Sequence, residues 1–265
     1  MDIAFLPFLR VFWRRIYVIA HVSDTWQHLK VPYLRWITFF ILRNMTRRVL
    51  IISENQRQVF FGLNTFKIHT ILHPAFGGLA VPHDKARKDF VYVGRITREK
   101  GIFDLVDAWA LLNQPKPRLR LFGQGSKEVL QKLAEEIRRK SLDGTITYEG
   151  PVSDPADLAR IYRGALATIY PSYADAFPLV MLESISQETP CIISKIGEVP
   201  NFLGDDYPWL IVPGDLLGIC AAVTAISSGV SAPVPRCLVE AARQYAQSAI
   251  IADFEHLDIL SSTPT

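Results

Sequence analysis

Short apolar runs alternate with amphipathic segments from residue 90 to residue 227, and this alternation constrains the fold more than any other feature. The short apolar runs predict strands at 90–94, 119–123, 146–150, 166–171, 190–194 and 209–213. Helical spacing of apolar residues, or a helix-start signal, predicts helices at 102–112, 126–140, 153–165, 178–188 and 215–227. Apolar strands joined by helices are typical of a parallel sheet covered on both faces. The sequence therefore predicts a doubly wound α/β unit.

A smaller α/β region precedes this unit. Its expected strands are 15–24, 48–53 and 67–72, and its expected helices are 33–44 and 54–63. Glycine, proline and charge mark a linker before residue 90, and the stretch 234–260 has a helical pattern. The predicted organisation is an N-terminal α/β domain at 1–74, a linker at 75–89, a C-terminal domain at 90–233, and C-terminal helices within 234–265.

The cysteines favour a reducing compartment. Three cysteines, far apart and odd in number, form neither a disulfide framework nor a zinc pattern. The best candidate for a membrane span, at 31–45, is interrupted by Arg35 and Arg43, so no transmembrane helix is expected. The expected location is the cytoplasm.

Residues 1–60 are basic and aromatic. They contain nine Lys or Arg residues and three acidic residues, with phenylalanine and tryptophan interleaved. This composition is typical of a helical region with solvated arginines over an aromatic core. It is also typical of a surface that contacts an anionic membrane, which would place the protein peripherally on the inner face. Both interpretations stay open, and no nucleic-acid partner is expected.

In open parallel sheets ligands bind at the carboxyl ends of the strands. The first strand-end turn carries Arg95 and Lys100, and two cations there suit a diphosphate, although both could be surface cations near Glu99. The second turn contains G-x-G, but Glu128 stands where a third glycine would be required. The dinucleotide fingerprint and the P-loop are both absent, which argues against a dehydrogenase and an NTPase.

The third turn, "PSYADAFPLVMLE", places Asp175 and Glu183 on either side of a helix start near Phe177 or Pro178. The backbone N–H groups of a helix start bind anions. Glu183 then lies about 7.5 Å of axial rise inside the helix, where its carboxylate can accept from neutral hydroxyls. The alternative is an Asp N-cap followed by an ordinary helical Glu.

Several stretches together resemble a known family. "YVGRITREKGI", "LRLFGQG", "ITYEGPVSD", "IYPSYADAFPLVMLESISQETPCIIS", "GEVPNF" and "LIVPGD" resemble, in order and spacing, the donor-binding half of glycosyltransferase family 4. These are retaining enzymes with two Rossmann-like domains, the GT-B fold. "IAHVSDTW", "LIISENQR" and "KIHTILHPAF" look like parts of the family's N-terminal domain, and the last helices look like its return crossing to that domain.

The resemblance implies a function. It implies transfer of a sugar, with retention, from a nucleotide-diphosphate sugar to a saccharide or lipid-linked acceptor, as in polysaccharide biosynthesis. It implies neither a metal nor a cofactor beyond the donor substrate itself.

The resemblance also assigns roles to residues. Arg95 and Lys100 match the pair that binds the donor diphosphate and stabilises the leaving group. Asp175 and Glu183 match the two acids of the E-x7-E motif, the first facing the donor sugar and the second holding the ribose. Phe177, Leu179 and Val180 match positions whose backbone contacts the sugar and the phosphates. His21 matches a histidine beside the transferred sugar.

Departures from the family pattern leave a second interpretation open. Asp175 replaces Glu and Ala176 replaces Gly, while Glu188 replaces Gly, Asn201 replaces Glu and His73 replaces Asn. The first part of the family's N-terminal domain, with its glycine-rich loop, has no counterpart here. The expectation is that a partner chain supplies this part, or that the protein is a non-catalytic nucleotide-sugar-binding subunit or a truncated, inactive relative.

Overall fold

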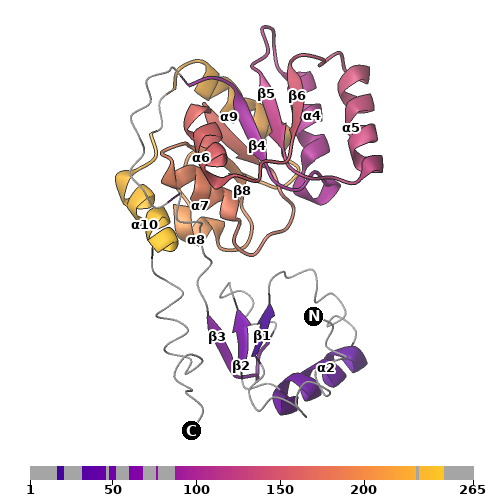
Figure 1. Cartoon of the computed structure of the whole chain (residues 1–265), viewed down its shortest axis with the longest axis vertical. Helices are drawn as coiled ribbons and strands as arrows, with labels where there is room; N and C mark the ends of the chain where they lie inside the picture. Colours follow the sequence, from indigo (N-terminus) through magenta and orange to yellow (C-terminus); the bar gives the residue numbers. More distant parts are fainter. Residues whose placement is uncertain are drawn as a thin grey trace. The chain divides into compact units, whose positions relative to one another are not determined.

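A computed structural model describes residues 17–20, 32–45, 48–51, 60–67, 76, 87–230 and 233–247 (Figure 1). The chain divides into two compact units. The first comprises Met1–Thr70, Ala174–Phe177 and Ile250–Thr265, and the second comprises Ile71–Tyr173 and Pro178–Ala249. The helices expected over 234–265 to return to the N-terminal domain are described only as α10 (Arg236–Gln247), and residues 248–265 lie outside the described ranges. The predicted domain boundaries stay a prediction.

The second unit is built on a six-stranded parallel sheet in the order β6-β5-β4-β7-β8-β9. The strands are β4 (Phe90–Val93), β5 (Leu119–Phe122), β6 (Ile146–Gly150), β7 (Ala167–Tyr170), β8 (Cys191–Ser194) and β9 (Leu210–Ile211). Every residue of β7 and β8 is buried, as the near-continuous apolar runs predict. The direction in which the chain crosses the sheet reverses between β4 and β7, which is the point where such sheets bind ligands.

Helices cover this sheet as a doubly wound fold requires (Figure 1). They are η4 (Arg98–Lys100), α4 (Ile102–Leu111), α5 (Lys127–Arg139), α6 (Pro155–Gly164), α7 (Leu179–Ser186), α8 (Val199–Leu203), α9 (Leu216–Ser227) and α10 (Arg236–Gln247). Right-handed crossovers that run in opposite directions along the sheet place α4 and α5 on one face and α6 and α7 on the other. Accordingly α4 packs against α5 and α9, and α7 packs against α6 and α10.

Side-chain caps begin three of these helices. Ser126 accepts from the Val129 N–H at 3.3 Å, Asp154 from the Ala156 N–H at 2.8 Å, and Asp215 from the Gly218 N–H at 2.8 Å. Each cap satisfies a backbone donor that has no partner within its helix. The expected Ser/Asp cap with a following proline is therefore confirmed for α6, where Asp154 precedes Pro155.

The first unit contains a three-stranded parallel sheet, β1-β2-β3, and one described helix. The elements are β1 (Tyr17–Ala20), α2 (Pro32–Met45), β2 (Arg48–Ile51) and β3 (Thr65–Lys67). Among the helices of the described ranges, none combines the length and the apolar character needed to cross a membrane.

Local details differ from the sequence expectations. Helix α8 was not expected, because its five residues are too few to show a period. Residues 60–63, the described part of the helix expected at 54–63, form a turn, and the earlier residues of that expected helix lie outside the described ranges. Strand β3 begins at Thr65, two residues before the expected start at 67.

Candidate functional site

The turns after β4 and β5 interlock at the carboxyl edge of the larger sheet. The Gly94 N–H donates to the Phe122 carbonyl at 3.0 Å, and the Ile96 N–H donates to the Gln124 carbonyl at 2.7 Å. A Cβ at Gly123 would stand 1.7 Å from the Gly94 carbonyl oxygen, so only glycine permits this approach. The two turns form a fixed backbone platform, which contains Arg95 and leads into the short helix η4 that ends at Lys100.

Lys100 and Arg95 lie at this edge in different environments. Lys100 is 5% exposed at the end of η4, and its ammonium lies 5.6 Å from the centroid of the Tyr170 ring. Such an approach offsets part of the cost of burying the charge. The Arg95 side chain is exposed, and its carbonyl accepts from the Tyr92 hydroxyl at 2.6 Å. The rings of Tyr92 and Tyr170 stack at 6.3 Å, so one aromatic pair contacts both predicted phosphate-binding residues.

Glu183 is not a surface acid. It is the fifth residue of α7, and its Oε2 accepts from the Tyr162 hydroxyl of α6 at 2.6 Å. Burial raises the pKa of the Glu183 carboxyl above its usual value, and the bond from Tyr162 opposes that rise. Burial also raises the pKa of Tyr162 well above its usual value, with the Glu183 charge adding to the effect, so Tyr162 remains a donor. Glu183 is therefore half-buried and hydrogen-bonded between two helices, and its role at the site stays a prediction.

The start of α7 also decides against an Asp cap. The N-cap residue is Pro178, three positions after Asp175, and no side chain of the N-cap residue closes the helix. The N–H groups of Leu179 and Val180 open α7 and cannot bond within it, which leaves a helix start suited to an anion. The expected helix start near Pro178 is confirmed to within one residue.

Two of the remaining predicted residues, Asp175 and Phe177, lie in the turn between β7 and α7. Asp175 and Phe177 are half-buried in the loop that groups with the first unit, and His21 lies outside the described ranges. Their roles stay predictions.

Sequence reasoning missed three tyrosines that contact the predicted residues. Tyr92 bonds the Arg95 backbone, Tyr170 lies under Lys100, and Tyr162 holds Glu183. Tyr92 and Tyr170 sit within apolar strand runs, and Tyr162 lies on an amphipathic helix, so each resembles a core residue in the sequence. A buried tyrosine needs a partner for its hydroxyl, and that requirement was the available signal.

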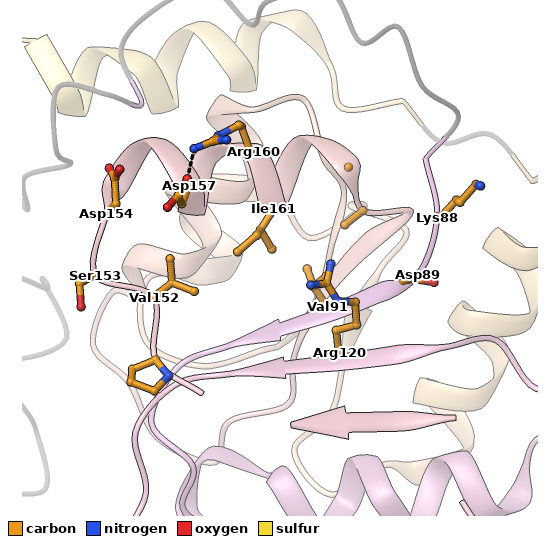
Figure 2. A pocket seen from close by; sticks show the side chains of 13 residues that line it. Lys88, Asp89, Val91, Arg120, Val152, Ser153, Asp154, Asp157, Arg160 and Ile161 are labelled. Atoms are coloured by element: carbon orange, nitrogen blue, oxygen red, sulfur yellow. Dashed lines mark hydrogen bonds and ion pairs between the residues drawn. The ribbon is translucent and has the colours of Figure 1, made fainter. Parts of the chain in front are cut away.

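A separate pocket of about 990 Å³ opens between α6 and the sheet at β4 and β5 (Figure 2). Val91 and Arg120 face it from the strands, and Ile161 faces it from α6. Arg120 pairs with Glu149 at 3.2 Å, and Arg160 pairs with Asp157. None of the predicted site residues lines this pocket, and two of its guanidinium groups are already neutralised. We therefore place the candidate site at the strand ends.

Throughout the ranges that the structure describes, no group of three or more His, Cys, Asp or Glu side chains could hold a metal ion. The expectation that the reaction needs no metal stays a prediction.

Comparison with protein families gives one match, to the family model for glycosyl transferases group 1, over residues 80–242. The D-inositol 3-phosphate glycosyltransferase of Arthrobacter sp. (strain FB24) is 32% identical over 156 residues, which cover 55% of this chain and 36% of that protein. The glycogen synthase of Mycobacterium tuberculosis (strain ATCC 25618 / H37Rv) is 28% identical over 178 residues, covering 66% and 41%. The chain thus spans between a third and a half of the length of these curated relatives.

Solved structures share the fold. Anabaena Alr3699/HepE, in complex with UDP and glucose, superposes with a TM-score of 0.79 at 15% identity, covering 99% of this chain and 76% of that one. The sucrose-phosphate synthase of Thermosynechococcus elongatus gives 0.70 at 20% identity, covering 93% and 68%. The predicted fold class, an α/β GT-B arrangement with a Rossmann-like doubly wound sheet, is confirmed.

Proposed function

The chain belongs to the family of glycosyl transferases group 1, and on this premise we propose that it binds a nucleotide-diphosphate sugar and transfers the sugar, with retention, to a saccharide or lipid-linked acceptor. The observation that carries the proposal is the shared edge of the larger sheet. Arg95 and Lys100 follow β4 there, and a helix start with a half-buried carboxylate, Glu183, follows β7. Cations, unpaired helix N–H groups and an acceptor carboxylate match phosphates and hydroxyls.

In this mechanism the chain acts mainly on the leaving group. Departure of the nucleoside diphosphate places negative charge on its outer phosphate, and preorganised positive groups stabilise that charge. Arg95 can bind two phosphate oxygens through its planar fork, whereas the buried Lys100 supplies a point charge held against Tyr170. The backbone at Phe177, Leu179 and Val180 receives the remaining phosphate and sugar oxygens.

The acids and the histidine complete the proposed site. From the family resemblance we propose that Asp175 binds hydroxyls of the donor sugar, that Glu183 binds the ribose, and that His21 acts on the transferred sugar. Three similar proteins support a nucleotide-diphosphate sugar as the substrate class. Two are relatives, a D-inositol 3-phosphate glycosyltransferase and a glycogen synthase, and the third is the Anabaena structure with UDP and glucose.

Calorimetry with UDP, GDP and ADP tests the binding half of the proposal. We expect one of them to bind, and we expect Arg95→Ala and Lys100→Ala each to weaken that binding about 10- to 100-fold, as the loss of a charge-assisted hydrogen bond does. The matched control is Arg120→Ala, because Arg120 lies in the separate pocket and pairs with Glu149. Binding of none of the nucleotides, or equal losses in all three variants, would contradict the proposal.

Catalysis is tested separately from binding. Sugar nucleotides of the base that binds are incubated with the protein, and release of the nucleoside diphosphate and the anomeric configuration of the product are followed by proton NMR. A product with the configuration of the donor supports retention. Binding without transfer or hydrolysis, with acceptors of both classes present, would instead favour the non-catalytic nucleotide-sugar-binding subunit.

A second proposal is peripheral contact of the first unit with an anionic membrane. Four exposed apolar side chains of α2 share one helical face by their spacing: Tyr33, Trp36, Ile37 and Phe40. Exposed Arg35 and Arg43 accompany them, and α2 contains no acidic residue. Aromatic and basic side chains together are typical of a helix that lies in the membrane interface.

Co-sedimentation with vesicles of phosphatidylcholine and phosphatidylglycerol at low salt tests this contact. We expect sedimentation to be lost in a Trp36→Ser, Phe40→Ser double variant. It should be retained in Leu217→Ser, which removes an equally exposed apolar side chain from α9. A wild-type chain that stays in the supernatant at low salt would contradict the contact.

A further inference from the structure

We propose that Tyr162 is a positioning residue for the nucleotide: its hydroxyl holds the Glu183 carboxylate in the one orientation that accepts from the ribose hydroxyls. The inference rests on the proposed function, because it presumes that Glu183 meets the ribose. Its basis in the structure is the 2.6 Å bond from the Tyr162 hydroxyl of α6 to Oε2 of Glu183 of α7.

Tyr162 is itself firmly held. Its side chain is fully buried, and its ring contacts Phe76 edge-on at 6.1 Å. Its carbonyl accepts from the Thr189 hydroxyl at 2.8 Å, on the segment between α7 and β8. A donor fixed at both its backbone and its ring defines the position of the atom that it bonds.

A glutamate needs such a partner to discriminate hydroxyls. Its side chain has three rotatable bonds, and fixing them at the moment of binding costs free energy. The carboxylate offers two oxygens, each with room for more than one donor. The bond from Tyr162 occupies part of Oε2 and orients the group, so Oε1 remains available as an acceptor for the vicinal ribose hydroxyls.

The experiment compares each nucleoside diphosphate with its 2′,3′-dideoxy analogue by calorimetry, using whichever of UDP, GDP and ADP the wild type binds. We expect Tyr162→Phe to weaken binding of the ribonucleotide about 10-fold and to leave binding of the dideoxy analogue unchanged. In a Glu183→Ala background the Tyr162→Phe substitution should have no further effect, because the group that it positions is gone.

Two further variants keep the test decisive. Tyr207→Phe is the matched control, because Tyr207 is also buried and its hydroxyl accepts from the Cys191 N–H at 3.0 Å, away from Glu183; it should leave both nucleotides unaffected. Glu183→Asp draws the carboxylate back by one methylene and should lose the same ribose preference, which covers the case in which Tyr162→Phe does not fold.

The outcomes separate the two levels of inference. Equal losses for ribonucleotide and dideoxy analogue in Tyr162→Phe, or no loss at all, overturn the positioning role while the proposed function stands. A wild-type chain that binds none of the nucleotides overturns the proposed function, and the positioning role with it.

Discussion

A Cβ atom at Gly101 would stand 2.2 Å from the carbonyl oxygen of Pro171. Gly101 follows Lys100 directly and is the N-cap residue of α4, and Pro171 follows β7, so this approach fixes the first strand-end turn against the third. Gly101 also has a φ of 72°, in the left-handed region that glycine adopts without a penalty. Glycine at position 101 therefore permits both the close approach to the Pro171 carbonyl and the left-handed backbone conformation, and no residue with a Cβ atom permits both.

Gly101→Ala should lower the free energy of unfolding by at least about 2 kcal/mol. The left-handed conformation alone costs an L-residue about 1–2 kcal/mol, and the collision with backbone adds to it. Urea denaturation measures the change. Gly144→Ala is the matched control, because Gly144 has a φ of 77° but nothing within 4 Å of the added Cβ, so it should lose only about 1 kcal/mol. Equal losses in the two variants would show that the Pro171 contact relaxes freely.

The sequence predicted the elements of the larger sheet well because their signals are local. A buried strand needs only a short apolar run, and α5 shows its amphipathic period within its own residues. The placement of the candidate site residues also followed from local signals, because strand-end turns in a parallel sheet lie at one edge of the sheet. The position of Lys100 after β4 and of Glu183 inside α7 could therefore be predicted.

The contacts that give those residues their properties could not be predicted in this way. Tyr162 and Glu183 are separated by 21 positions, and they meet only because α6 and α7 pack together. Lys100 likewise lies over the ring of Tyr170, a residue that its strand pattern identifies only as core. Local patterns define which face of an element is buried, but not which partner covers it.

Ser184→Ala should cost about 2–3 kcal/mol of stability, more than Thr168→Val. The Ser184 hydroxyl donates to the Thr189 carbonyl at 2.9 Å and lies 2.6 Å from the Thr168 hydroxyl, and all of these groups are buried. Removing the Ser184 hydroxyl leaves the Thr168 hydroxyl without an acceptor and the Thr189 carbonyl without this donor. Unpaired polar groups in the core carry the full cost of their desolvation. Thr168→Val retains the bond from the Ser184 hydroxyl to the Thr189 carbonyl and should cost about 1 kcal/mol. Denaturation in urea compares them, and the reverse order would contradict the assigned hydrogen-bond directions.

Glu188 and Arg243 should respond unequally to substitution. Arg243 of α10 donates to the Ser186 carbonyl and to the Glu188 carboxylate, each at 3.0 Å, and its side chain is 14% exposed. Arg243→Ala should therefore cost about 1–2 kcal/mol, since it leaves a carbonyl at the end of α7 without this donor.

Glu188→Gly should change stability by less than about 1 kcal/mol. Glu188 has a φ of 59°, so glycine relieves a left-handed strain and offsets the loss of a half-exposed ion pair. The bond from Arg87 goes to the Glu188 carbonyl and is retained. Thermal and urea unfolding of both single variants measure the difference. A Glu188→Gly variant that is as unstable as Arg243→Ala would show that the ion pair dominates.

Glu183→Gln should stabilise the nucleotide-free protein at neutral pH. Burial raises the pKa of Glu183 in the folded state above its usual value of 4.5, so the native state holds this proton more tightly than the unfolded chain does. The stabilising contribution is therefore complete below pH 4.5 and is lost as the pH rises through the folded pKa. Glutamine carries no charge at any pH and can still accept from Tyr162 through its amide oxygen.

The expected result is a melting temperature of Glu183→Gln above that of the wild type at pH 7, with the difference shrinking as the pH falls toward 4.5. Scanning calorimetry across this range measures it, and Glu240→Gln, which changes an exposed acid of α10, is the control. The same substitution should weaken nucleotide binding, because an amide group replaces one acceptor oxygen. A variant less stable than the wild type at pH 7 would contradict the prediction. It would mean that the surroundings of Glu183 stabilise its ionised carboxylate, so that burying this charge does not destabilise the nucleotide-free protein.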